Sequence, residues 1–165
     1  MRIDIRQATK EDIPRMAQVI NATYKEAFSG LLSDETIAKY TNEKRRLKSL
    51  EELFTGKLPH YVVIYDGVLC GALTASIPKK ELPLTVEIVQ LYVLSEYRGK
   101  RLGKKLLSHA LCGYRKLGYK TAVLTTLEEN ENAIAFYKHF GFSSVGLIAT
   151  GLEAGKRLEK FRIEL

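Results

Sequence analysis

The clearest chemical signal in the sequence is the segment Arg98–Gly103, which reads RGKRLG. A diphosphate needs several convergent hydrogen-bond donors and no bulky group in its way. A loop that leads into a helix supplies them, because the first helical N–H groups are unpaired and lie at the positive end of the helix dipole. Gly99 and Gly103 permit unusual backbone angles and close approach of a ligand. Further positive charge comes from Lys100, Arg101, Lys104 and Lys105. Taken alone, the segment is equally typical of a basic helix start without a ligand.

A second segment, Asn130–Phe142, carries aromatic and small side chains at helical spacing. The spacing alone makes Tyr137 a core residue more readily than a catalytic one. Asn130 has the residue type and the position of a helix N-cap. One apolar face is formed by Ala133, Phe136, Tyr137 and Phe140.

Together the two segments resemble the GNAT superfamily of acyl-coenzyme A-dependent N-acetyltransferases. Its members carry an R/Q-x-x-G-x-G/A loop between a strand and a helix. The following helix carries an N-x-x-A-x-x-F/L-Y-x-x-x-G-F segment. The chain matches this second pattern at Asn130, Ala133, Phe136, Tyr137, Gly141 and Phe142. In the loop, Arg101 stands where the first glycine is expected. Its Cβ limits how closely the backbone can approach a phosphate, while its guanidinium can itself contact one.

The resemblance implies that acetyl-CoA (coenzyme A) is the co-substrate, and it implies roles for individual residues. Tyr137 matches a tyrosine that protonates or hydrogen-bonds the departing sulfur. Asn130 matches a residue that hydrogen-bonds the pantetheine, a role compatible with capping the helix. The backbone of the segment Leu91, Tyr92 and Val93 matches the part that pairs with the pantetheine arm. The resemblance places the diphosphate on Arg98, Gly99, Lys100, Arg101, Leu102, Gly103 and Lys104.

Glu87 is the candidate catalytic base, because it is the only acidic residue on the predicted strand Thr85–Leu94. The resemblance implies that a carboxylate on this strand takes the proton of the attacking amine, directly or through water. Strict alternation puts Glu87 on the same face as Leu91 and Val93. In the family that the chain resembles, the corresponding strand usually carries a β-bulge. A bulge here would change which side chains share a face with Glu87. An exposed edge carboxylate without a catalytic role is the open alternative.

Hydrophobic periodicity predicts a mixed α/β order along the chain. Strands are expected at residues 1–6, 61–65, 68–77, 85–94, 120–126, 142–149 and 157–164, and helices at 10–28, 102–117 and 130–140. The charged stretch after Ser33 forms one helix or two short ones. Asp66-Gly67 is a strong hairpin signal. The resemblance implies an α/β (α+β) fold, with a mostly antiparallel twisted sheet of about six to seven strands and about four helices, as one domain over 1–165.

Composition places the chain among ordinary globular proteins, with 45% hydrophobic and 27% charged residues. We expect a cytoplasmic protein, because the N-terminus lacks an apolar signal region. Cys70 and Cys112 stand outside any metal-binding spacing and are expected to be reduced, mostly buried thiols, so no metal is predicted. The three histidines, His60, His109 and His139, are interpreted as structural or surface residues.

The acceptor remains open at this level: a small amine, including a polyamine, or a peptide N-terminus. The net charge of +7 suits a polyanionic cofactor but does not favour a polycationic acceptor. Tyr24, Phe28 and Tyr40 are core residues more readily than pocket residues. Two other functions stay as alternatives: a coenzyme A-binding regulatory domain without catalysis, and a basic nucleic-acid-binding module. The second is disfavoured because the basic residues are interspersed with Glu. A homodimer is compatible with the resemblance.

Overall fold

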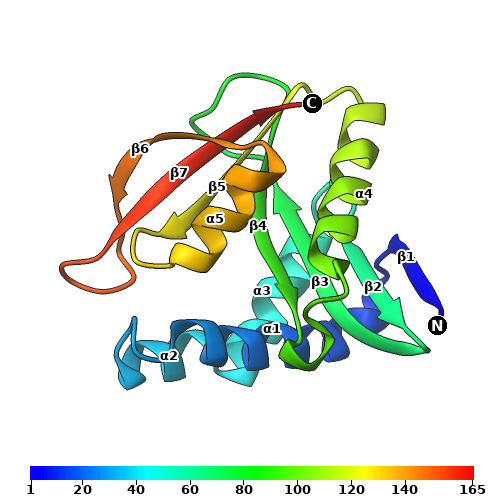
Figure 1. Cartoon of the computed structure of the whole chain (residues 1–165), viewed down its shortest axis with the longest axis horizontal. Coiled ribbons are helices and arrows are strands. Elements are labelled where there is room, and N and C mark those ends of the chain that lie inside the picture. Colours follow the sequence, from blue (N-terminus) through cyan, green and yellow to red (C-terminus); the bar gives the residue numbers. More distant parts are fainter.

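The computed structural model describes all residues, Met1–Leu165, as one seven-stranded sheet with helices on both faces (Figure 1). The strands run in the order β1-β2-β3-β4-β5-β7-β6. Every neighbouring pair is antiparallel except β4 and β5, which are parallel. The mixed, mostly antiparallel fold predicted from the sequence is therefore confirmed.

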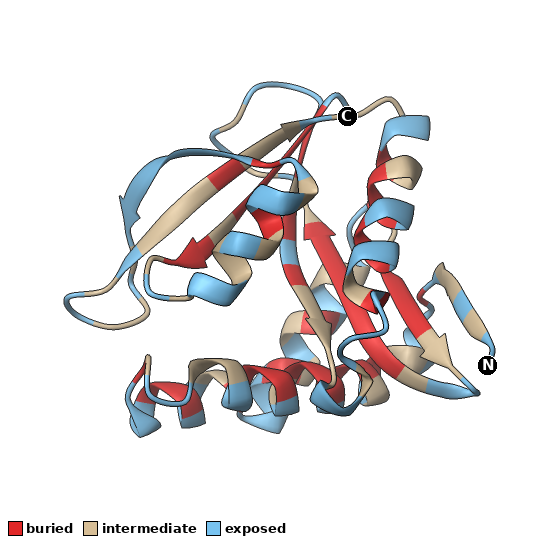
Figure 2. Ribbon diagram, in the orientation of Figure 1, coloured by how far each residue is buried: buried red, intermediate tan, exposed pale blue.

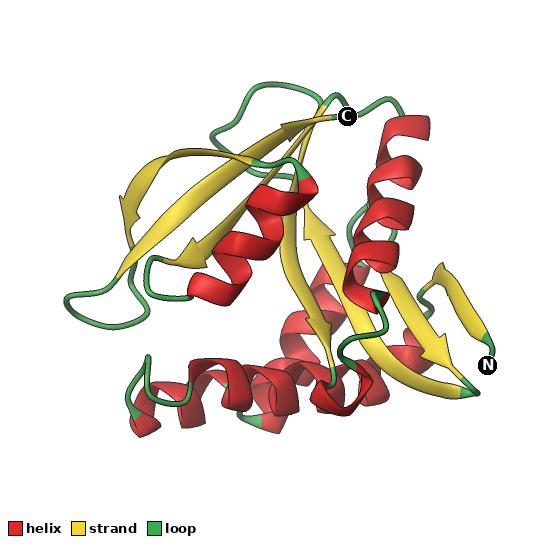
Figure 3. Cartoon of the chain, viewed as in Figure 1, coloured by secondary structure: helices red, strands yellow, loops and turns green.

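The strands are β1 (Ile3–Gln7), β2 (Tyr61–Tyr65), β3 (Val68–Ser76), β4 (Thr85–Val93), β5 (Thr121–Leu127), β6 (Ser143–Ala149) and β7 (Arg157–Glu164). The helices, drawn in red in Figure 3, are α1 (Ile13–Phe28), α2 (Asp34–Tyr40), α3 (Glu43–Phe54), α4 (Leu102–Lys116) and α5 (Glu131–Phe140). Two 3-10 turns, η1 (Lys10–Asp12) and η2 (Ser95–Tyr97), precede α1 and α4. None of the helices combines the length and apolar composition needed to cross a bilayer.

Local sequence signals explain two of these boundaries. The charged stretch after Ser33 forms two helices, because Asn42 interrupts it and caps α3 by accepting a hydrogen bond from the Arg45 N–H. Asp66 and Gly67, between β2 and β3, both have positive φ angles of 48° and 84°. A type I′ hairpin turn requires positive φ at both positions, which confirms the hairpin.

The core lies on both faces of the sheet, because successive strand residues point to opposite sides. On one face, Val63 and Leu73 pack with α4 and with Tyr137 of α5. On the other face, Val62 and Ala72 pack with α1 and α3. Figure 2 shows these central strands largely buried, whereas β6 at the sheet edge is exposed along its length. The buried central strands therefore form the framework on which a site can be built.

Gly71 allows β3 to pack closely against its neighbours near the end of β4. A Cβ at this position would lie 2.6 Å from Val63 Cγ1 and 2.9 Å from Val93 Cγ2. We expect Gly71→Ala to lower the free energy of unfolding by about 1–3 kcal/mol, because both valines are held in the sheet. Urea denaturation measures the change. Gly151→Ala is the matched control, since a Cβ there meets no atom within 4 Å; equal effects of the two substitutions would contradict the prediction.

Candidate active site

Strands β4 and β5 part from each other after a short parallel contact. They pair only where Thr85–Glu87 faces Thr121–Val123. Beyond this point β4 stays with β3 and β5 stays with β7, so the two strands diverge (Figure 1). Each strand thus presents backbone N–H and C=O groups that no neighbouring strand satisfies, and an elongated polar ligand can pair with them.

The loop before α4 forms a concentrated anion-binding element. Six consecutive N–H groups, from Gly99 to Lys104, have no hydrogen-bond acceptor in the protein. The last three belong to the first turn of α4, where the helix dipole is positive. This arrangement fits a diphosphate, as the sequence predicted for the loop.

Arg101 has the left-handed backbone conformation, with φ 59° and ψ 21°. This conformation costs a residue with a Cβ roughly 1–2 kcal/mol and is the natural one for glycine. It explains why the resembling pattern has glycine at this position. The arginine side chain is exposed and lies beside the unpaired N–H groups. It therefore adds a positive charge at the same place where its Cβ limits the approach of the backbone to a ligand.

A cavity of about 850 Å³ connects the loop, the parted strands and α5. It is lined by every residue predicted to bind the cofactor except Lys100, whose ammonium lies 5.3 Å from the centre of the Tyr65 ring. The backbone N–H of Lys100 belongs to the loop, while its side chain lies beside the Tyr65 ring, so a role for Lys100 in binding stays a prediction. The volume is within the range of small-molecule sites. The predicted residues that line the cavity are Leu91, Tyr92, Val93, Arg98, Gly99, Arg101, Leu102, Gly103, Lys104, Asn130 and Tyr137.

Tyr137 both packs in the core and lines the cavity. Its ring lies 5.6 Å from that of Phe142 and 6.4 Å from that of Phe161, centre to centre. Its hydroxyl makes no hydrogen bond within the chain, and the residue is only 9% exposed. Burial raises the pKa of this phenol, and the neighbouring Tyr92 raises it further, so the hydroxyl stays protonated at neutral pH.

Asn130 has the N-cap position that the sequence predicted. Its side-chain oxygen accepts a hydrogen bond from the Ala133 N–H at 3.3 Å. The residue also lines the cavity, and its amide nitrogen has no partner in the chain. Capping and ligand contact are therefore compatible in this residue.

A β-bulge sets the direction of Glu87. Thr74 of β3 lies opposite Gln90, and the next residue, Ala75, lies opposite Ile88, so Val89 has no partner. The strict alternation expected for this strand is therefore wrong beyond Ile88. Val86 and Ile88 share the α4 face with Leu91 and Val93, whereas Glu87 shares the α1 face with Gln90 and Tyr92.

Glu87 lies on the α1 face of β4 and is not among the residues that line the cavity. The side chain is half-buried and makes neither a hydrogen bond nor an ion pair within the chain. Burial raises the pKa of this carboxyl, because desolvation disfavours the charged form. A carboxylate without partners can accept a proton from a ligand on the α1 face.

His139 lines the cavity, a position that no pattern in the sequence indicates. Phe136 follows Asn132 by four residues and His139 follows Phe136 by three, which puts all three on one side of α5. His139 is exposed, as expected for a surface residue, and it also forms part of the cavity wall. His60 is structural as expected: it is buried, its Nδ1 accepts the Ala75 N–H, and its Nε2 lies 3.1 Å from the Leu53 carbonyl oxygen.

Helix α1 contributes a wall of the cavity that sequence reasoning missed. Thr23, Glu26 and Ala27 line it, and the Glu26 Oε1 accepts a hydrogen bond from Arg98 Nη1 at 2.9 Å. Only the folded chain brings these two charges together, because they are 72 residues apart in the sequence. The aromatic residues Tyr24, Phe28 and Tyr40, by contrast, pack together in a small core cluster.

The fold and the cavity define a protein that can hold an elongated, diphosphate-bearing ligand between two parted strands. Residues 19–142 match the model of the acetyltransferase (GNAT) family. The chain belongs to this family, and it is an N-acetyltransferase that uses acetyl-CoA.

Individual relatives agree with this assignment. A spermidine N(1)-acetyltransferase of Thermoplasma acidophilum is 27% identical over 86% of this chain and 89% of its own length. An uncharacterized N-acetyltransferase of Escherichia coli is 32% identical over 86% of this chain and 82% of its own. The crystal structure of the PaiA N-acetyltransferase of Thermoplasma acidophilum, in complex with coenzyme A, shares the fold with a TM-score of 0.75. It is 22% identical and covers 97% of this chain and 98% of its own.

Proposed function

We propose that the protein transfers the acetyl group of acetyl-CoA to a primary amine by direct attack within a ternary complex. The observation that carries this proposal is the arrangement of β4. Tyr137 lines the cavity and packs on the α4 face of the sheet, whereas Glu87 lies on the α1 face of β4 without a partner. Two substrates can therefore approach from opposite faces and meet where β4 and β5 part.

The cofactor supplies an activated thioester, and residues of the chain hold it. In this proposal the free N–H groups from Gly99 to Lys104 bind the diphosphate, with Arg98 and Arg101 neutralising its charge. The unpaired edge of Leu91–Val93 and the Asn130 amide hold the pantetheine arm. A backbone N–H of this edge donates to the carbonyl oxygen of the thioester and stabilises the charge that develops there.

The reaction requires one proton to leave the amine and one to reach the sulfur. Glu87, with its raised pKa, takes the amine proton directly or through a water molecule. A C–N bond forms and the C–S bond breaks. The Tyr137 hydroxyl, protonated because burial raises its pKa, donates its proton to the departing thiolate. The phenolate then regains a proton from solvent through the cavity.

We propose a small primary amine as the acceptor. Support comes from the relative named a spermidine acetyltransferase, which matches this chain over most of its length. The positive net charge of +7 counts against long polycations, so a monoamine or a short diamine fits the charge better.

A panel of amines with acetyl-CoA, followed by release of free thiol, tests both the reaction and the acceptor class. The panel contains butylamine, 1,4-diaminobutane, spermidine and a short peptide with a free N-terminus. We expect turnover well above the amine-free rate with at least one small amine and weaker turnover with the peptide. Coenzyme A binding without thiol release from any amine would contradict the catalytic proposal and favour a regulatory coenzyme A-binding domain.

A further inference from the structure

Glu26 is the only acidic residue that lines the 850 Å³ cavity. The other charged lining residues are the cations Arg98, Arg101 and Lys104, beside His139. A carboxylate in a cavity that otherwise suits a diphosphate is unexpected, because the two negative charges repel each other and oppose binding of the diphosphate. The carboxylate therefore needs an explanation that packing of α1 does not provide.

The partner of Glu26 is the first residue of the loop that offers the unpaired N–H groups. The Arg98 Nη1 donates to the Glu26 Oε1 at 2.9 Å, and the two side chains are 53% and 44% exposed. An exposed ion pair of this kind contributes only about 0–1 kcal/mol to stability. The pair is thus weak enough to open when a better acceptor for the guanidinium arrives.

A diphosphate is such an acceptor. Its oxygens can engage a guanidinium in two parallel hydrogen bonds, which a phosphate group forms at least as well as a carboxylate does. Bound at the N–H groups of Gly99–Lys104, it would also sit beside Arg98, which lines the same cavity. Arg98 cannot give its best hydrogen bonds to both anions.

We propose that Glu26 is a positioning residue that occupies Arg98 while the cofactor site is empty and yields the guanidinium to the diphosphate of coenzyme A. This inference rests on the proposed binding of the cofactor in the cavity. Glu26 holds the arginine at the cavity wall between turnovers, and it competes with the bound product for the same guanidinium. The competition weakens coenzyme A binding and favours release of the product.

One substitution should change the affinity for coenzyme A in a defined direction. Glu26→Gln removes the competing charge while keeping the shape of the side chain, so coenzyme A should bind more tightly, by about three- to tenfold near physiological salt. Pantetheine, which lacks the diphosphate, should bind equally to both proteins. In an Arg98→Gln background the effect of Glu26→Gln should disappear, because the contested group is absent.

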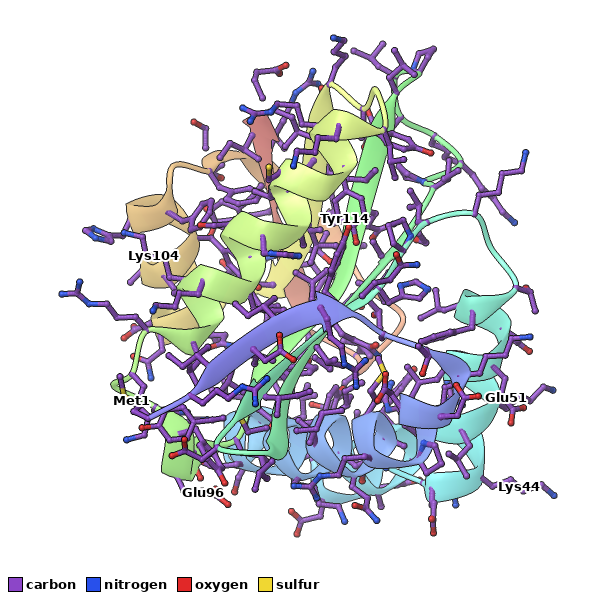
Figure 4. All side chains as sticks on the ribbon, turned by 90° about the vertical axis from the view of Figure 1, so that its right-hand side faces the viewer. Met1, Lys44, Glu51, Glu96, Lys104 and Tyr114 are labelled. Atoms are coloured by element: carbon purple, nitrogen blue, oxygen red, sulfur yellow. The ribbon has the colours of Figure 1, made fainter.

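Glu96→Gln is the matched control. Glu96 is an exposed acid in η2, two residues before Arg98, and it lies outside the cavity. Figure 4 places it at the outer edge of the molecule, below the turn that leads to α4 and away from Lys104. Its substitution should leave the coenzyme A affinity unchanged if the effect of Glu26 is specific.

Isothermal titration calorimetry with coenzyme A and with pantetheine measures the five proteins: the natural chain, the three single variants and the Glu26→Gln/Arg98→Gln double variant. Weaker coenzyme A binding by Glu26→Gln would overturn the inference, since Glu26 would then only hold Arg98 in place. An equal gain in the Arg98→Gln background, or for pantetheine, would also overturn it. Failure of every protein, including the natural one, to bind coenzyme A would instead contradict the proposed function.

Discussion

Replacing Tyr137 by phenylalanine is expected to lower kcat for amine acetylation about 100-fold, because a positioned general acid contributes roughly 10²–10⁴ to a rate. The hydroxyl makes no hydrogen bond within the chain, so its removal breaks none. The affinity for coenzyme A and the thermal midpoint of unfolding should therefore stay nearly unchanged. Such a separation of kcat from binding and stability identifies a chemical role rather than a packing role.

Tyr24→Phe is the matched control for this prediction. Tyr24 is 8% exposed, packs among aromatic rings and has a hydroxyl without a hydrogen-bond partner, but it lies outside the cavity. Stopped-flow or steady-state measurement of thiol release, over a pH range of several units, compares the two variants with the natural protein. Full turnover by Tyr137→Phe at every pH would show that the departing sulfur takes its proton from elsewhere.

Replacing Glu87 by glutamine is expected to lower kcat/KM for the amine about 100-fold or more at neutral pH. The base works only when it is deprotonated, and burial raises its pKa above the ordinary value for glutamate. Activity of the natural protein should therefore rise as the pH increases through this raised pKa. In Glu87→Gln the increase of activity with pH that is due to this carboxyl should disappear. Only the pH dependence due to deprotonation of the free amine should remain.

Glu159→Gln provides the comparison for Glu87→Gln. Glu159 is a half-buried carboxylate on β7 that also lacks a hydrogen bond and an ion pair, and it does not line the cavity. A pH series of kcat/KM under saturating acetyl-CoA distinguishes the two. Coenzyme A should bind both variants with natural affinity, since neither residue lines the cofactor cavity. An unchanged pH profile in Glu87→Gln would remove this residue from the mechanism.

The elements that hold the cofactor cavity could be predicted because their signals are local. Glycine and basic residues before an amphipathic helix identify the loop from Arg98, and helical spacing places Tyr137 and Asn130 together on the next helix. Each signal involves residues within a few turns of one another, where backbone geometry alone decides the neighbours. The resemblance then connected the two segments, and the structure brings them to one cavity.

The parts that escaped prediction depend on contacts between distant segments. Nothing near Glu26 in the sequence indicates that it meets Arg98, because the approach of α1 to the loop is a property of the whole fold. The position of the bulge at Val89 is set by pairing with β3 and has no sequence signature of its own. The side chain of Lys100 turns to the Tyr65 ring, a neighbour from β2.

The bulge at Val89 also determines which genetic changes strand β4 can accept. Its one additional residue lets Val86 and Ile88 share a core face with Leu91 and Val93, while Glu87 keeps the opposite direction. Deleting Val89 would remove the bulge and leave both faces as they are, because the remaining residues then alternate regularly. Inserting a single residue would instead reverse one half of the strand, burying a carboxylate or exposing the valine and isoleucine. We therefore expect β4 to tolerate the loss of Val89 better than the insertion of a residue.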